Sequence, residues 1–165
     1  MLDFLFKKQP QGRLWLFLDV DGVLNTETDW QCPFTFNTRC VRAFQASLKE
    51  LRKCFAEVSI ILSSSWRSGW DPANQPQHIR ELCREVPVVG ITPQAGASSQ
   101  KGQRGREIRH YLKMHSSPEA FLILDDDQRL FTDEDRAELP ILFTDAKHGF
   151  TSKDGERMMS LVKHR

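Results

Sequence analysis

The sequence has no cysteine pattern typical of a zinc site or of a disulfide-stabilised domain. Its four cysteines, Cys32, Cys40, Cys54 and Cys83, form no C-x-x-C motif and no paired Cys/His spacing, which argues against zinc. Disulfide frameworks belong to smaller, secreted domains than this chain of 165 residues. We therefore expect reduced thiols in a reducing compartment.

Long apolar runs and an excess of charge of one sign are also absent. No apolar stretch approaches the length that crosses a membrane. Residues 1–8 are too short for a signal peptide, and Asp3 precedes their lysines. We expect a soluble, cytoplasmic protein that does not bind membranes. Because the formal net charge is +1, any argument for a nucleic-acid partner must come from local clusters.

The length and the hydrophobic fraction of 39% suit a single globular domain with one core. Residues 1–12 end in Gln9-Pro10-Gln11-Gly12 and are expected to be an N-terminal arm, and residues 13–165 are expected to be one domain. Residues 26–36 are polar and aromatic and are interrupted by Pro33. They predict a flap or hairpin over the site that packs on the domain or contacts the substrate.

Apolar runs alternate with helical periodicity along the chain, which favours a three-layer α/β/α sandwich around a mostly parallel sheet. Asn37 is a suitable N-cap for the first helix. Strands are predicted at 14–18, 58–62, 86–91, 121–124 and 141–143, and helices at 38–55, 76–85, 102–114 and from 151 onward.

The first predicted strand runs directly into Asp19-Val20-Asp21-Gly22. In extended backbone, residues i and i+2 point the same way, so Asp19 and Asp21 face one site beyond the strand's carboxyl end. Open α/β sheets bind ligands there. Two adjacent carboxylates repel unless a cation or shared proton intervenes, which favours Mg²⁺ binding or acid/base chemistry. A plain Asp-Gly turn is the alternative, and the apolar strand before it makes that alternative the weaker one.

Polar residues also follow two later strands. Ser63-Ser64-Ser65 comes after 58–62, Asp125-Asp126-Asp127 comes after 121–124, and a basic segment spans 101–113. If the strands are parallel, these groups meet at one edge. Acids, hydroxyls and a cationic side chain together suit phosphoryl transfer. Taken singly, the serines are also consistent with a loop start, the aspartates with a turn, and the basic segment with a solvated helix face.

These segments resemble the motifs of the haloacid dehalogenase (HAD) superfamily of phosphohydrolases. Phe17–Asn25 is similar to its first motif, Ile60–Arg67 to its second and Phe121–Asp126 to its fourth. More narrowly, S-S-W-R, R-G-x-E-I, L-D-D-D and T-D…G-F-T resemble the small HAD domains associated with RNA-repair proteins. The likeness spans about residues 14–162. It implies a Rossmann-like HAD fold without a large cap domain.

The resemblance implies roles for the acidic residues. Asp19 would be the nucleophile and form an aspartyl-phosphate. Asp21 would protonate the leaving oxygen and later activate water. Mg²⁺ would lie between Asp19, the main-chain carbonyl of Asp21 and Asp126, with Asp125 assisting.

The resemblance also implies partners for the phosphoryl group. Ser64 would bind it, with Ser63 as the alternative register. The third motif normally supplies a lysine, and Lys101 and Arg104 both compete for that role. Arginine would keep the charge of lysine and alter the geometry. The candidate substrate-binding residues are Ser63, Ser65, Arg67, Arg106 and Arg109.

The implied function is that of a Mg²⁺-dependent phosphatase with an open site. The segments between the motifs leave no room for a cap domain, so the site accepts the end of a macromolecule and encloses a small metabolite poorly. The basic segment at 101–113 favours the phosphorylated end of a nucleic acid as the substrate. The alternatives are a small phosphoester, a phosphoprotein, or a non-catalytic phosphate-binding or receiver-like domain. Receiver domains place the phospho-accepting aspartate mid-chain, whereas D-x-D comes first here. The sequence does not indicate an oligomeric state.

Overall fold

The computed structural model describes residues 10–68, 80, 86–94 and 100–163. They contain a five-stranded sheet with the order β3-β2-β1-β4-β5, and every pair of neighbouring strands is parallel. The predicted N-terminal arm lies mostly outside the described residues, and so does nearly all of the helix predicted at 76–85. The strands are β1 (Arg13–Leu18), β2 (Glu57–Leu62), β3 (Val88–Ile91), β4 (Ala120–Asp125) and β5 (Ile141–Phe143).

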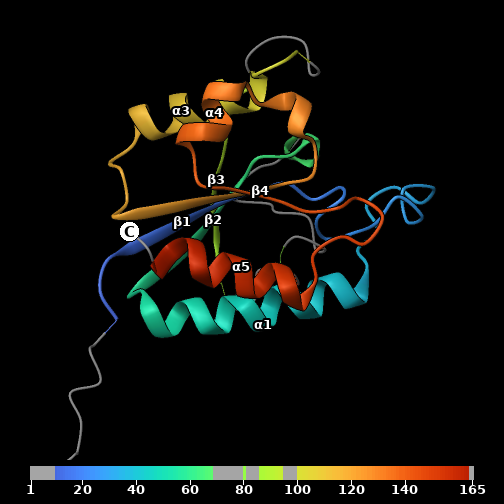
Figure 1. The fold of residues 1–165 in the computed structure, drawn as a ribbon, viewed down its shortest axis with the longest axis horizontal. Coiled ribbons are helices and arrows are strands. Elements are labelled where there is room, and N and C mark those ends of the chain that lie inside the picture. The colour runs from blue at the N-terminus through green and yellow to red at the C-terminus, as the bar shows by residue number, and fades with distance from the viewer. Residues whose placement is uncertain (1–9, 69–79, 81–85, 95–99, 164–165) are drawn as a thin grey trace, which may run out of the picture.

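Helices cover both faces of the sheet (Figure 1). On one face, α1 (Thr38–Cys54) packs beside α5 (Ser152–Lys163), and on the other lie α3 (Gln103–Met114) and α4 (Asp133–Glu138). The predicted three-layer α/β/α fold is therefore confirmed. The described residues contain no cap domain.

The alternation of side chains along β1 explains why both faces are buried. Leu16 and Leu18 belong to the core beneath α1 and α5, whereas Trp15 and Phe17 belong to the core beneath α3. Residues on a strand point alternately to opposite faces, so an unbroken apolar run is what a strand covered on both sides requires.

The element boundaries follow local capping chemistry. The Asn37 side chain accepts hydrogen bonds from the backbone N–H groups of Arg39 and Cys40, as the predicted N-cap requires. Helix α4 is not predicted from the sequence, because its six residues are too few for a periodic pattern. Its N-terminus is a capping box in which Thr132 and Asp135 satisfy each other's backbone N–H.

The contact between α3 and α4 depends on the glycine of the R-G-x-E-I segment. A Cβ atom at Gly105 would lie 2.3 Å from an oxygen of the Asp135 carboxylate. Glycine therefore allows the N-terminus of α4 to approach α3 closely.

The segment predicted as a flap or hairpin, residues 26–36, forms successive turns and no strand, so the hairpin alternative was wrong. Asp29 holds it together: Oδ2 accepts hydrogen bonds from the Thr26 backbone N–H (2.8 Å), the Thr26 hydroxyl (2.7 Å) and the Asn37 amide (3.1 Å). These bonds hold the pKa of Asp29 below its usual value of 3.8, and the bond from the Thr26 hydroxyl has the largest effect. Its ionised form therefore stabilises the segment.

We expect Asp29→Ala to lower the free energy of unfolding by about 1 kcal/mol at neutral pH, since these bonds are partly exposed to solvent. A carboxyl with a lowered pKa stabilises the fold above its unfolded pKa and loses that effect as pH falls through its folded pKa. The difference from the wild type should therefore persist from about pH 8 to 5 and shrink below about pH 4. Denaturation at each pH measures it, with Glu27→Ala as the control in the same segment. A difference that does not change with pH would contradict this account.

Candidate active site

The register of the central strands brings three strand ends to one level. Leu18 of β1 pairs with Leu62 of β2 and with Leu124 of β4. Just beyond, the Asp19 N–H donates to the Leu124 carbonyl at 2.9 Å, and the Ser63 N–H donates to the Leu18 carbonyl at 2.8 Å. The first residues after all three strands therefore lie together at the carboxyl edge of the sheet.

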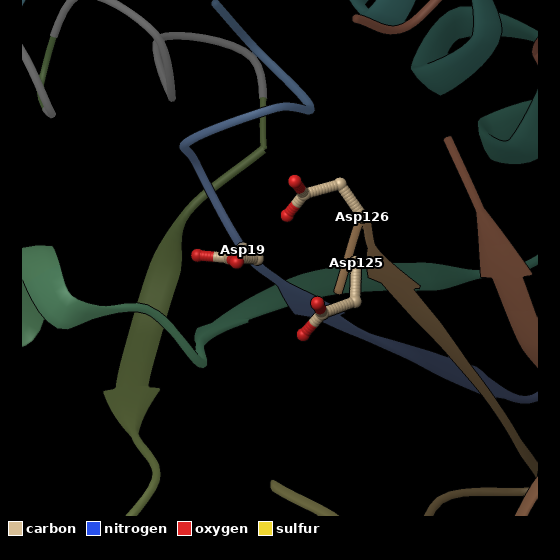
Figure 2. A group of neighbouring side chains, drawn as sticks. All are labelled: Asp19, Asp125 and Asp126. Atoms are coloured by element: carbon tan, nitrogen blue, oxygen red, sulfur yellow. The ribbon is translucent and has the colours of Figure 1, made fainter. Parts of the chain in front are cut away.

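Three carboxylates converge at this edge. Asp19, Asp125 and Asp126 each offer an oxygen, and these atoms lie within 4.8 Å of one another (Figure 2). Asp19 is 6% exposed and Asp125 is 1% exposed. Burial, and then the Asp19 charge, raises the pKa of Asp125 well above its usual value and that of Asp126 to about 7. Burial also raises the pKa of Asp19, and Arg104 opposes that shift. The cluster accumulates negative charge that a cation would compensate.

The chemistry of these donors fits a hard divalent cation. Oxygen ligands from carboxylates are what Mg²⁺ and similar ions prefer. The described residues at this edge add no histidine or cysteine to the group. The three aspartates thus form a possible metal site, and Asp21 stands beside it rather than within it.

Arg104 is the cation that the structure places in the site. It is 8% exposed; Nη2 lies 3.6 Å from Asp19 Oδ2, and Nε lies 3.2 Å from Asp125 Oδ2. Its guanidinium also donates to the main-chain carbonyl of Ser63. Lys101, the competing candidate for the third motif, is exposed at the turn before α3. Of the two candidates for the third motif, Arg104 is therefore the one that contacts the acidic cluster.

The two serine registers have different surroundings. The Ser64 hydroxyl lies near enough to the Asp19 carboxylate to lower the pKa of that carboxyl group, against the larger effect of burial. It also accepts from the Trp66 N–H at 3.3 Å, as the N-cap of the short helix η1 (Ser65–Arg67). The Ser63 hydroxyl instead lies 3.4 Å from both Thr92 Oγ1 and Arg104 Nη1. Ser64 is therefore the serine that faces the nucleophile candidate.

Asp21 is held by residues that sequence reasoning did not single out for the site. Its Oδ1 accepts from the Asn25 amide at 2.9 Å, and its Oδ2 accepts from the Trp66 indole N–H at 3.0 Å. The Asn25 side-chain oxygen in turn accepts from the Gly22 N–H at 3.0 Å. These bonds fix the carboxylate beside the acidic cluster. Asn25 and Trp66 both lie inside segments that resemble HAD motifs, and that was the only available signal.

The turn after Asp21 has no room for a side chain. Gly22 has a φ of +71°, and a Cβ atom there would lie 2.3 Å from Asp126 Oδ2. The Thr144 hydroxyl, just after β5, donates to the Gly22 carbonyl at 2.8 Å. Sequence reasoning missed this support, although Thr144 also follows a predicted strand.

The remaining candidates have differing surroundings. Arg67 is buried, and its Nη2 pairs with Glu107 Oε2 at 2.9 Å. Arg106 and Arg109 lie on the exposed side of α3. Arg109 pairs with Asp135 at 3.1 Å and Glu138 at 2.9 Å, so these carboxylates compete for its charge. Ser65 contributes to a groove beside Asp21.

The parallel sheet, the acid pair after β1 and the acids after β4 define a HAD-type domain. A family model described as the HAD domain in Swiss Army Knife RNA repair proteins matches residues 15–154. The chain belongs to this family. A comparison with curated proteins finds no match. Among the described residues, no helix has the length and apolar character needed to span a membrane.

Proposed function

We propose that this protein is a Mg²⁺-dependent phosphatase that forms an aspartyl-phosphate on Asp19. The observation that carries the proposal is the cluster of Asp19, Asp125 and Asp126, with the Arg104 guanidinium against it, in a chain of a HAD family. The superfamily consists mostly of phosphohydrolases, and no other group of nucleophile, acid and cation in the described residues is so well assembled.

In the first half of the reaction, an Asp19 carboxylate oxygen attacks the phosphorus atom of a phosphate monoester. The bond to the leaving oxygen breaks, and Asp21 gives that oxygen a proton. Arg104 contacts Asp19 and the Ser64 hydroxyl lies near it, and we assign both the donation of hydrogen bonds to the phosphoryl oxygens. Such preorganised donors stabilise the charge of the transition state.

In the second half, water attacks the phosphorus of the aspartyl-phosphate. Asp21, now ionised, takes the proton of this water, so the two proton transfers balance. The Asp19 carboxylate is restored and inorganic phosphate is released. Because Asn25 and Trp66 hold both oxygens of Asp21, the same carboxylate is positioned for both steps.

Asp19, Asp125 and Asp126 would hold the metal ion, together with the main-chain carbonyl of Asp21. When bound, the ion neutralises charge on the phosphoryl group and on the crowded carboxylates. Burial and the Asp19 charge raise the pKa values of Asp125 and Asp126, and a bound cation would favour their ionised forms.

The metal assignment predicts different effects at neighbouring positions. We expect Asp126→Ala to raise the Mg²⁺ concentration for half-maximal activity by about tenfold or more, as losses of coordinating interactions do. Asp127→Ala should leave it unchanged, because the Asp127 carboxylate pairs with Arg129 at 2.9 Å. Titration of activity with Mg²⁺ distinguishes the two. The reverse ranking would move the metal site by one residue.

We propose a phosphate-ended nucleic acid as the substrate. The family's description names RNA repair proteins, and the described residues contain no cap domain to close over the site. We propose that exposed Arg106 on α3 adds a phosphate contact, whereas Arg109 is already paired with Asp135 and Glu138. A small phosphoester or a phosphoprotein is the alternative substrate class.

The substrate proposal predicts a salt-sensitive preference. We expect kcat/KM for a phosphate-ended oligonucleotide to exceed that for the mononucleotide at about 50 mM salt and to fall towards it at about 200 mM, because phosphate contacts release counterions. Arg106→Ala should reduce the preference more than Arg109→Ala does. Arg52→Ala is the control, since Arg52 lies at the far end of α1, near the amino edge of the sheet. Equal kcat/KM at low salt would favour the smaller substrates.

A further inference from the structure

A groove of about 310 Å³ opens beside Asp21. Its walls include Trp30 and Phe34 from the segment 26–36, and Trp66 from η1. We call these three residues and the space between them the aromatic groove. Because Asp21 and Ser65 also line it, the groove is continuous with the candidate active site on the side of the proposed acid.

Exposure sets these rings apart. In the part of the chain that the structure describes, the exposed large aromatic side chains are Trp30, at 46%, and Phe34, at 60%. A single exposed apolar side chain is ordinary, but a contiguous exposed apolar surface commonly marks a binding site. Both exposed rings border the same groove, which indicates a ligand with a flat apolar face.

Hydrogen bonds hold the edges of the two indoles. The Trp30 Nε1–H donates to Asn25 Oδ1 at 3.0 Å, and the Trp66 Nε1–H donates to Asp21 Oδ2 at 3.0 Å. Phe34 packs edge-on against Trp66, with ring centroids 5.2 Å apart. The groove therefore has rings whose orientation is set before a ligand binds, and preorganised surfaces lose less entropy on binding.

The backbone at Phe34 adds an independent observation. Phe34 has a φ of +56°, and it is the one non-glycine residue with a positive φ among the described residues. A bulky side chain rarely adopts this conformation, and such outliers concentrate at ligand contacts. Glycine or asparagine would suit the turn better, yet the chain places a phenyl ring there, against Trp66 and at the groove.

We propose that the aromatic groove binds the base of the terminal nucleotide of a phosphate-ended single strand by stacking. The inference rests on the proposed function: with the phosphoryl group bound at Asp19, the leaving oxygen faces Asp21 and the attached nucleoside extends into the groove that Asp21 lines. Aromatic stacking accepts any base, because every base has a π-face. The site would therefore process ends with little sequence preference.

Cys32 provides a probe, because it is exposed and lines the groove, while exposed Cys54 at the end of α1 serves as an internal control. Asp19→Asn protein with Mg²⁺ is alkylated in the presence of a phosphate-ended oligonucleotide, or of the same strand with an abasic terminal nucleotide. We expect the normal strand to slow alkylation of Cys32 severalfold, the abasic strand to slow it much less, and neither to affect Cys54. Equal protection by both strands, or protection by neither, would overturn the inference.

Turnover provides the second test. For each variant, kcat/KM for the normal strand is divided by kcat/KM for the abasic strand. One stacked base contributes roughly 1–3 kcal/mol, and tenfold corresponds to 1.4 kcal/mol, so we expect a wild-type ratio of about five or more. Phe34→Asn tolerates the positive φ without the ring and should bring the ratio near one. Phe34→Tyr keeps the ring and should retain the ratio. Met114→Ala, which removes an exposed apolar side chain elsewhere, is the control.

Hydrolysis of glycerol phosphate, which has no aromatic group, tests the proposed phosphatase activity separately from base stacking in the aromatic groove. If the wild type hydrolyses it and treats both strands alike, the phosphatase assignment survives and the stacking inference fails. If a phosphotyrosine peptide protects Cys32 better than either strand, the groove serves a peptide and the inference also fails. If only the normal strand protects Cys32 but no phosphate ester is hydrolysed, the groove binds a base and the proposed catalysis fails.

Discussion

Asp19→Asn should lower kcat by a factor on the order of 10⁴ or more, the scale on which loss of a nucleophile acts in other hydrolases. The amide has the shape of the carboxylate but cannot attack phosphorus to form the proposed acyl phosphate. Steady-state hydrolysis of a generic aryl phosphate with Mg²⁺ measures the loss. A chelator should abolish the activity of the wild type.

The same variant should remain folded. Burial raises the pKa of Asp19, which means that its ionised form destabilises the native state at neutral pH when no cation is bound. Removing that charge should therefore leave the metal-free protein at least as stable as the wild type. Asp133→Asn, at an exposed carboxylate on α4, is the matched control and should retain full activity. Full activity of Asp19→Asn would exclude Asp19 as the nucleophile.

Arg104→Ala should have the largest effect on stability. Its guanidinium lies against Asp19 and Asp125, and all three side chains are at least nine-tenths buried. Removing one member of a buried ion pair typically costs about 3–5 kcal/mol, because the remaining charges stay buried without compensation. Catalysis should also fall by roughly 10²- to 10³-fold, as it does when a preorganised donor is lost. Urea denaturation and kcat measure the two effects.

Arg104→Lys separates charge from geometry. Lysine keeps the positive charge but cannot reach Asp19, Asp125 and the Ser63 carbonyl at once, so stability and activity should both be intermediate. Arg109→Ala is the control, since its exposed ion pairs contribute at most about 1 kcal/mol. Mg²⁺ should stabilise Arg104→Ala, because binding to the native state alone shifts the equilibrium. A fully stable, active Arg104→Ala would contradict the proposed role.

Most of the fold could be predicted because one physical signal recurs. A strand covered on both faces needs an unbroken apolar run, and Leu14–Leu18, Val58–Leu62 and Phe121–Leu124 each have one. Polar residues that end such runs must lie at the same edge if the strands are parallel. That reasoning predicts Asp19, the serines and Asp125 at one edge of the sheet, where the structure also has them.

The choices within the site depended on distances that the sequence does not contain. Lys101 and Arg104 are three residues apart, and only the start of α3 places one at the turn and the other over Asp19. Ser63 and Ser64 are adjacent in the sequence, and only the fold places the Ser64 hydroxyl near Asp19 and the Ser63 hydroxyl near Thr92 and Arg104. Asn25 and Trp66 hold Asp21 through hydrogen bonds. They come from separate segments that only the tertiary fold brings together.

The substrate-binding candidates show the same limit. Arg67 and Arg109 were candidates for substrate binding, yet both have carboxylate partners, Glu107 in the first case and Asp135 and Glu138 in the second. A basic residue in a sequence does not reveal whether its partner is a substrate or the protein itself. The aromatic groove was only partly anticipated, because residues 26–36 were predicted as a flap without the contribution of Trp66.

The most direct test is to look for a phosphoryl group on Asp19 during turnover. The enzyme is mixed with substrate and Mg²⁺, quenched rapidly in acid to preserve acyl phosphates, and digested for mass spectrometry. The account predicts a phosphorylated peptide with the group on Asp19, which should be absent from Asp19→Asn. Turnover by the wild type with the phosphoryl group on another residue, or on none under conditions that trap acyl phosphates, would contradict it.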